Sequence, residues 1–236
     1  MPDAATFVSE NLLRVRESIA RAANVAGRRT EDVRLIAASK TQPPAAIEAA
    51  LAAGQADFGE SMAQDALKKI PLFRGRHLTW HFIGHLQSNK TKFMPGNFSW
   101  IHSVDSLKIA TRLEQAAQEH DGRLNALIEV NIARDPGRHG ILPERIPALV
   151  EQWLTQRFQR LDLRGLMAMA PYPAEEAETR RAFAAVRELR DALAVHFALP
   201  NFTELSMGMS GDFEAAILEG ATQVRVGSSI FGERSY

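Results

Sequence analysis

The sequence of 236 residues contains no cysteine and no excess of charge of either sign. Without cysteine the chain has no disulfide, no thiolate nucleophile and no cysteine-ligated metal, which fits a reducing compartment. Its 28 basic residues balance 28 acidic ones. Proteins that bind nucleic acid or a membrane surface usually carry a basic excess, so we expect neither kind of partner.

Long hydrophobic runs are also missing, since no stretch approaches the roughly 18 apolar residues of a transmembrane helix. The first residues, Met1 to Ala4, lack the basic segment and apolar core that begin a secretory signal peptide. Both absences predict a cytoplasmic protein.

What is present is ordinary for a soluble globular protein, namely 45% apolar and 24% charged residues. A chain of this length buries about 70% of its unfolded surface, so it can fold without cross-links. No linker or low-complexity segment divides it, and we therefore expect a single domain over residues 1–236. The even charge balance favours a monomer.

The chain opens with a helical pattern and continues with eight strand–helix repeats. Apolar residues spaced four and three apart, from Val8 to Ala26, predict a helix over residues 4–26 that stops at Gly27. Apolar runs of strand length predict strands over residues 33–39, 57–60, 80–84, 100–104, 126–131, 164–170, 204–207 and 223–226. Helical patterns predict helices over residues 44–53, 62–69, 87–93, 107–119, 143–156, 174–197 and 211–219, followed by a short terminal turn.

This alternation of strands and helices predicts the α/β class. The strand runs are apolar on both faces, which is typical of buried parallel strands. Eight repeats in roughly 210 residues fit a single (β/α)8 TIM barrel with an extra N-terminal helix. A doubly wound open sheet is the rival arrangement.

Lys40 directly follows the first apolar strand, in the run Leu35-Ile36-Ala37-Ala38-Ser39-Lys40. In a parallel barrel the carboxyl ends of the strands face the active site. Apolar surroundings disfavour the charged form of a lysine, and the neutral amine can attack a carbonyl to form a Schiff base. The alternative is a loop lysine whose ammonium group reaches solvent.

The end of the last strand offers a second group of candidates, Arg225, Gly227 and Ser228. Gly227 lets a ligand approach the backbone, and Ser228 with the amides after it can bind phosphate, as loops after strands seven and eight of barrels often do. An ordinary strand-to-turn junction also favours glycine and serine. Strand alternation directs Arg225 into the barrel mouth, where its guanidinium needs either a carboxylate or a ligand acceptor.

A third candidate is the segment after the seventh strand, Ser206-Met207-Gly208-Met209-Ser210. Its small polar residues suit a close ligand approach, and Met207 and Met209 can pack against a flat ring. A glycine-containing turn with two core methionines is the alternative.

Two weaker candidates remain. His81 and His85 are four residues apart, as some metal ligands are, but they lie across a strand end with no evident third ligand, so we predict no metal site. Arg138 is the one candidate ligand contact in the loop from Asp135 to Gly140.

Taken together, these residues resemble one known family, the pyridoxal phosphate homeostasis proteins (PLPHP). The resemblance runs from the leading helix nearly to Tyr236. It is carried by six motifs, which are LIAASKT (35–41), FGE (58–60), HFIGHLQSNK (81–90), LMAM (166–169), LSMGMS (205–210) and VRVGSSIFG (224–232).

The resemblance implies a single (β/α)8 barrel like the N-terminal domain of bacterial alanine racemase. It implies pyridoxal 5′-phosphate (PLP) held covalently as an internal aldimine on Lys40, with Arg225 against the pyridine nitrogen. The other implied contacts are Ser206, Ser210, Gly227 and Ser228 with the phosphate, Arg138 with the phenolic oxygen, and Met169 near the ring.

The implied site favours carrying the cofactor over catalysis. Arginine stays charged and cannot accept a proton from the cofactor, so the pyridine nitrogen would stay unprotonated and stabilise carbanions weakly. A racemase also needs a second base, which in alanine racemase is a tyrosine from another domain. This chain has only Tyr172 and Tyr236 and no length for that domain.

We therefore predict a protein of PLP homeostasis that binds, buffers or delivers PLP, with apo PLP-enzymes as possible recipients and no dedicated catalytic residue. A PLP-dependent racemase or lyase of low activity is the alternative. A cofactor-free Schiff-base aldolase and a pure interaction protein are two further alternatives.

Overall fold

A computed structural model describes residues 4–233 of the chain as a closed parallel β-barrel surrounded by helices. Each strand pairs with the next one in sequence, and β8 pairs with β1. The closed order confirms the predicted (β/α)8 barrel and excludes the open sheet. The strands are β1 (Arg34–Ala38), β2 (Asp57–Glu60), β3 (Thr79–Phe82), β4 (Trp100–Val104), β5 (Leu124–Val130), β6 (Leu161–Ala168), β7 (Glu204–Ser206) and β8 (Gln223–Val226).

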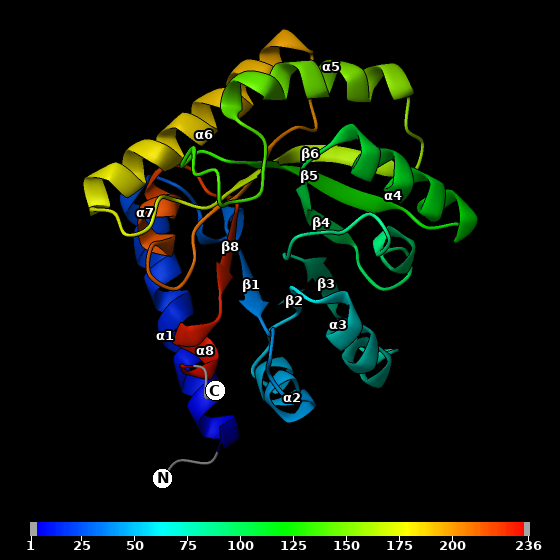
Figure 1. The fold of residues 1–236 in the computed structure, drawn as a ribbon. Helices are drawn as coiled ribbons and strands as arrows, with labels where there is room; N and C mark the ends of the chain where they lie inside the picture. The colour runs from blue at the N-terminus through cyan, green and yellow to red at the C-terminus, as the bar shows by residue number, and fades with distance from the viewer. Residues whose placement is uncertain (1–3, 234–236) are drawn as a thin grey trace.

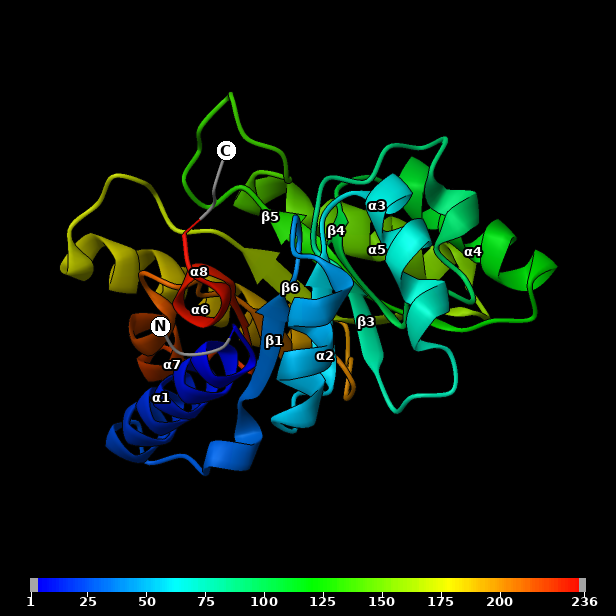
Figure 2. The same ribbon diagram turned by 90° about the horizontal axis from the view of Figure 1, so that it is seen from below.

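The helices lie outside the barrel, as Figures 1 and 2 show from two directions. The α-helices are α1 (Ala4–Val25), α2 (Pro44–Ala52), α3 (Ala63–Lys69), α4 (Leu107–Glu119), α5 (Ile146–Gln156), α6 (Glu176–His196), α7 (Phe213–Leu218) and α8 (Ser228–Phe231). Short 3-10 helices are η1 (Thr30–Asp32), η2 (Ile70–Phe73), η3 (Thr91–Phe93) and η4 (Pro143–Arg145). No helix in the described part of the chain is long and apolar enough to cross a membrane.

Helix α1 is the extra N-terminal helix, and it packs beside α2, α7 and α8 (Figure 1). The apolar stripe from Val8 to Ala22 is buried against the barrel, because its spacing keeps these side chains on one face. The Asn11 side-chain amide donates to the Ile230 carbonyl at 3.1 Å. The first helix therefore holds the last one, α8, in place at the barrel mouth.

The helix predicted over residues 87–93 is wrong, because the structure has only the 3-10 turn η3 there. Ser88 and Asn89 favour local side-chain hydrogen bonds over helix interiors, and a seven-residue helix gains little from propagation. Pro95 and Gly96 then close the segment.

Several boundaries differ from the prediction by one or two residues, and two differ by more. The helix expected over residues 143–156 begins as the 3-10 turn η4, and α5 follows with Pro147 in its first turn, where its missing N–H costs nothing. Strand β6 begins at Leu161 rather than at 164, and the β5–β6 register shifts between Ala126 and Leu127. The first residues of β6 alternate between apolar and polar side chains, so they do not form the continuous apolar run from which the strand was predicted.

Apolar side chains fill two separate regions. The larger one lies between the strands and the surrounding helices. The smaller one lies inside the barrel and consists of Trp100, Leu127 and Met167. The rest of the buried interior includes polar side chains such as His81 and His102, so the barrel has a polar layer beneath its mouth.

Candidate functional site

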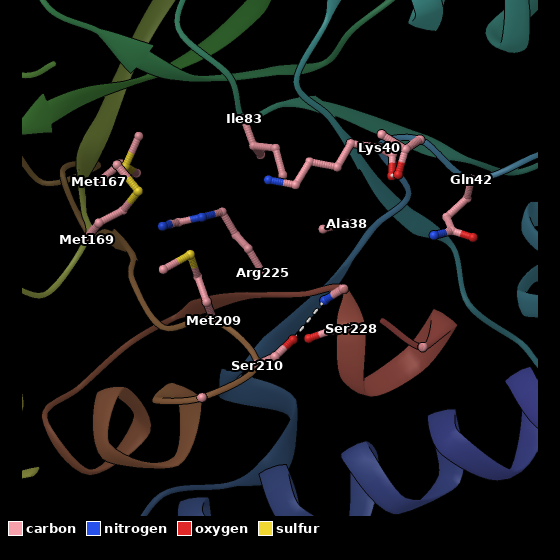
Figure 3. A pocket seen from close by; sticks show the side chains of 14 residues that line it. Ala38, Lys40, Gln42, Ile83, Met167, Met169, Met209, Ser210, Arg225 and Ser228 are labelled. Atoms are coloured by element: carbon pink, nitrogen blue, oxygen red, sulfur yellow. Dashed lines mark hydrogen bonds between the residues drawn. The ribbon is translucent and has the colours of Figure 1, made fainter. Parts of the chain in front are cut away.

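A cavity of about 330 Å³ opens at the carboxyl ends of the strands, where a parallel barrel presents its site. Strand ends and the two segments after β7 and β8 surround it (Figure 3). Its lining residues are Ala38, Lys40, Thr41, Gln42, Ile83, Met167, Met169, Met209, Ser210, Gly211, Arg225, Gly227, Ser228 and Gly232.

Lys40 enters this cavity from the end of β1, with its side chain extended past Ile83 (Figure 3). Alternation along the strand places it on the same face as Ala38 and Ile36. Thr41, the next residue, has φ of 67°, a left-handed conformation that is unusual for a β-branched side chain. The chain therefore turns sharply away just after Lys40, which leaves the lysine side chain inside the barrel mouth.

A buried ion pair fixes the backbone from which Lys40 extends. The Lys69 amine lies 2.9 Å from Glu60 Oε1, with side chains only 10% and 1% exposed. The same amine donates to the Ser39 carbonyl at 3.0 Å, and the Ser39 hydroxyl donates to Glu60 Oε1 at 2.7 Å. Because this pair is buried and fully hydrogen-bonded, it determines the geometry of residues 39 and 40.

Arg225 points into the cavity from β8, opposite the methionines of β6 (Figure 3). Its Nη1 donates to the Ser206 carbonyl at 2.7 Å and to the Ser206 hydroxyl at 2.6 Å. Its Nη2 donates to the Ala168 carbonyl at 3.1 Å. The guanidinium is thus held by the ends of two neighbouring strands and is only 5% exposed.

These three acceptors are neutral oxygens, and no ion pair of Arg225 occurs among residues 4–233. Burial lowers the pKa of Arg225 to about 10, while the charges of Glu129 and Asp212 oppose this change. The group therefore stays charged at neutral pH. The carboxylate partner that the sequence left open is therefore not found in contact with Arg225 in the described residues, and a buried cation without one is costly unless a further acceptor is supplied.

The end of the cavity below α8 gathers hydrogen-bond donors. The Ser210 hydroxyl accepts from the Gly227 amide at 3.2 Å and the Ser229 amide at 3.4 Å, and Ser228 lies beside it (Figure 3). A Cβ on residue 227 would lie 3.2 Å from the Ala38 carbonyl oxygen. A side chain at residue 227 would therefore crowd the close approach of β8 to β1, and this end of the cavity presents the hydroxyls of Ser210 and Ser228.

Burial raises the pKa of two acidic residues near Arg225. Burial raises the pKa of Glu129 to about 7, with a further contribution from the charge of Asp105. Oε2 of Glu129 has no hydrogen-bond partner in the described structure. Burial also raises the pKa of Asp212, although its hydrogen bond from the Met209 amide opposes this.

Six of the sequence-predicted residues line the cavity together, and three do not. The six are Lys40, Met169, Ser210, Arg225, Gly227 and Ser228. Ser206 is fully buried beneath Arg225 and Met207 is fully buried in the core, so neither is a lining residue. Arg138 donates to the Ala170 carbonyl at 2.7 Å and lies 3.4 Å from Asp135.

The lining residues Gln42, Ile83 and Met167 were not predicted as site residues from the sequence. Of the two methionines expected to pack against a flat ring, Met207 and Met209, only Met209 lines the cavity. Alternation offered a signal for Met167, which shares a strand face with Met169. Met209 follows Gly208, whose φ of 96° reverses the chain, so alternation cannot be extended to it.

The two histidines weighed as metal ligands lie apart. His81 is buried inside the barrel, whereas His85 lies at the mouth and stacks on His139 with ring centroids 3.6 Å apart. Asp105 Oδ2 is 3.7 Å from His85 Nδ1, which brings together three residues of ligand type. The two rings are parallel to within 7°, so their nitrogen lone pairs lie in parallel planes and do not converge on one point.

The fold and this site define a class, a (β/α)8 barrel of the alanine racemase type. Residues 11–235 match the family model described as alanine racemase, N-terminal domain. Alanine racemase of Clostridium difficile superposes with a TM-score of 0.71 at 14% identity, over 97% of this chain and 57% of that one, which shows the shared fold.

Nearer relatives narrow the class to one family. A pyridoxal phosphate homeostasis protein of Pseudomonas aeruginosa is 45% identical over 229 residues, 97% of this chain and 96% of that relative. The one of Escherichia coli is 42% identical over 237 residues, 97% of each. PipY of Synechococcus elongatus, solved with PLP bound, has a TM-score of 0.83 at 38% identity, over 95% of this chain and 100% of that one. This chain belongs to the pyridoxal phosphate homeostasis protein family.

Proposed function

We propose that this chain binds PLP and serves PLP homeostasis by buffering the cofactor and delivering it to apo-enzymes. One observation carries the proposal: the Lys40 amine and the buried Arg225 guanidinium enter one cavity, whose third side presents the amides and hydroxyls of 210 and 227–228. The PLP-bound relative PipY supports it, since that barrel shares 38% of its sequence with this one.

The cavity fits the three functional parts of PLP. The Lys40 amine condenses with the aldehyde, forming a carbon–nitrogen double bond and releasing one water. Arg225 can donate from its free N–H groups to the pyridine nitrogen. The phosphate fits the end formed by the Ser210 and Ser228 hydroxyls beside Gly227, where Ser210 accepts from the Gly227 and Ser229 amides and can donate its own proton to the phosphate.

The remaining proposed contacts surround the ring and its phenolic oxygen. Met169, with Met167 and Met209, supplies apolar and polarisable surface to a flat ring. Arg138 is the proposed partner of the phenolic oxygen, since its bond to the Ala170 carbonyl holds it beside the end of β6. Ser206 acts through Arg225, which its oxygens hold.

The same residues favour a carrier. When bound, PLP supplies an electron sink for amino-acid chemistry, and the protein decides how strong that sink is. Arg225 cannot accept a proton, so it keeps the pyridine nitrogen unprotonated. Among the described lining residues only Lys40 and Arg225 have side chains that titrate, and Tyr172 is 87% exposed.

Transfer of PLP to an apo-enzyme tests the proposal. The chain loaded with PLP and freed of excess cofactor should restore activity to an apo PLP-enzyme faster than PLP leaves it for a chemical scavenger. The Lys40→Ala variant, treated identically, is the matched control and should restore little. Reactivation no faster than spontaneous release would contradict delivery, and a chain that retains no PLP at all would contradict binding.

A further inference from the structure

Five polar side chains form one continuous chain of hydrogen bonds through the barrel interior. Asp57 Oδ1 lies 2.9 Å from His81 Nε2, and His81 Nδ1 lies 3.0 Å from His102 Nε2. His102 Nδ1 lies 2.8 Å from the Ser206 hydroxyl, which lies 2.6 Å from Arg225 Nη1. The members come from β2, β3, β4, β7 and β8. His81, His102 and Ser206 are fully buried.

We call this chain of hydrogen bonds from Asp57 to Arg225 the relay. The groups at its two ends indicate which atom donates in each hydrogen bond. Arginine can only donate and the Asp57 carboxylate can only accept, so the Ser206 oxygen accepts from Arg225 and, with both histidines neutral, the Ser206 hydroxyl donates to His102 Nδ1. His102 must then carry its proton on Nε2 and donate to His81 Nδ1. His81 in turn donates from Nε2 to the Asp57 carboxylate. Each of the five groups is used consistently, and both histidines are neutral.

The charges around the histidines agree with this assignment. Burial lowers the pKa of His102 well below 6.5, and the charges of Arg225 and Arg34 lower it further. Burial also lowers the pKa of His81, although Asp57 and Glu204 oppose that change. Burial first, and then the repulsion that a second cation beside Arg225 would meet, keep His102 neutral, as the hydrogen bond from Ser206 requires.

We propose that His102 is a positioning residue for Arg225, acting through Ser206. The neutral His102 Nδ1 accepts a hydrogen bond from the Ser206 hydroxyl. This bond orients the hydroxyl so that its lone pairs face Arg225 Nη1. Nη1 donates to Ser206 twice and Nη2 donates to Ala168, which leaves the Nε–H and one Nη2–H of the five donors for a ligand. The inference deepens the proposed function and rests on it, because the ligand atom concerned is the pyridine nitrogen of PLP.

The far end of the relay lies at the amino-terminal end of β2, where Asp57 is the first residue of the strand. The Asp57 side chain is 23% exposed, and its Oδ1 also lies 3.7 Å from Arg34 Nε. His81 stacks on Trp100, with ring centroids 5.9 Å apart and planes 11° apart. The orientation of a cavity arginine is therefore determined by contacts that extend through the whole depth of the barrel.

Nitrogen-15 NMR of the histidine rings in the PLP-free chain tests the relay itself. We expect His81 and His102 to be neutral Nε2–H tautomers at about pH 6, below the usual histidine pKa. A charged His102, or a proton on its Nδ1, would overturn the inference. This measurement needs no PLP, so failure of the proposed function would leave its outcome intact.

Substitutions test the positioning role. The His102→Phe variant keeps an aromatic ring at this position but removes the hydrogen-bond acceptor. The hydrogen bond between Ser206 and the charged Arg225 is then disturbed, so PLP should bind about tenfold more weakly and its absorption band should shift. His102→Asn keeps an acceptor near the Nδ1 position and should restore both properties. Ser206→Ala serves as a second disrupting variant if His102→Phe does not fold. The control is His120→Asn on the surface.

Folded His102→Phe or Ser206→Ala protein with unchanged affinity and absorption would overturn the proposal. Weaker binding in His102→Asn equal to that in His102→Phe would do the same, because it would assign the effect to packing. A wild-type chain that does not bind PLP would instead contradict the proposed function.

Discussion

At the scale of single residues, the barrel buries ionisable side chains that lack an oppositely charged partner or a full set of hydrogen bonds. Arg225 keeps its charge and receives only neutral acceptors from the described protein. Glu129, on the neighbouring side of the mouth, is 4% exposed and leaves one oxygen without a partner. A ligand acceptor would therefore add a partner for Arg225, and a change of pH near 7 would change the charge of Glu129.

Glu129 should make the free energy of unfolding depend on pH. Burial raises its folded pKa from 4.5 to about 7, so the folded state binds the proton more tightly than the unfolded state. The stabilisation is complete below pH 4.5 and is lost as pH rises to 7, a total of about 3 kcal/mol. Urea unfolding of wild type and Glu129→Gln at several pH values measures the difference.

The variant should lose much of this slope between about pH 5 and pH 7. Glu48→Gln is the control, since the Glu48 side chain is 47% exposed in its pair with Arg76. Equal slopes in wild type and Glu129→Gln would contradict the assignment.

Sequence reasoning found residues such as Lys40 and Arg225 because strand ends and alternation determine where they point. It did not find the partners of Arg225. Ser206, His102 and His81 meet inside the barrel from strands about 20 to 100 residues apart, and one sequence carries no signal for such contacts. A polar residue within an apolar strand, such as His102 in β4, was the available hint.

At the scale of elements, the segment from β7 to α7 brings Met209 and Ser210 to the cavity. Gly208 adopts a φ of 96°, and its carbonyl accepts from the Arg225 amide at 2.9 Å. A Cβ there would lie 2.7 Å from the Ala216 Cβ and 2.9 Å from the Phe213 Cα. The turn therefore requires glycine, and Met209 and Ser210 reach the cavity because of it.

Gly208→Ala should displace this segment from the cavity. The backbone strain and the clash with α7 should cost about 1–3 kcal/mol, and PLP should bind more weakly because Ser210 moves. Thermal unfolding and PLP titration measure the two effects. Gly122→Ala is the control, because a Cβ there meets nothing nearer than 3.5 Å. A variant with wild-type stability and affinity would contradict the role of this turn.

Element prediction succeeded where one side-chain periodicity dominated. The stripe of α1 and the spans of β2, β4, α4 and β8 agree with the sequence prediction because their apolar spacing is regular. It failed at η3 and at the start of β6, where polar residues and a register shift break the pattern. Helix ends fray and often finish as 3-10 turns, so apolar spacing alone does not predict where they lie.

For the whole molecule, one closed barrel provides a cofactor cavity with few groups for catalysis. Racemases that share the fold are longer, since this chain covers 57% of the Clostridium difficile alanine racemase. Single-domain organisation over residues 1–236, a monomeric state and a cytoplasmic location stay predictions of the sequence.

Borohydride reduction of the PLP-loaded chain, followed by peptide mass mapping, tests the central claim most directly. The reduction fixes any double bond between PLP and a lysine as a stable amine. We expect the phosphopyridoxyl group on the peptide containing Lys40, and Lys40→Ala should lose both the label and the yellow colour. Labelling of another lysine, or equal labelling of the Lys40→Ala variant, would contradict the account.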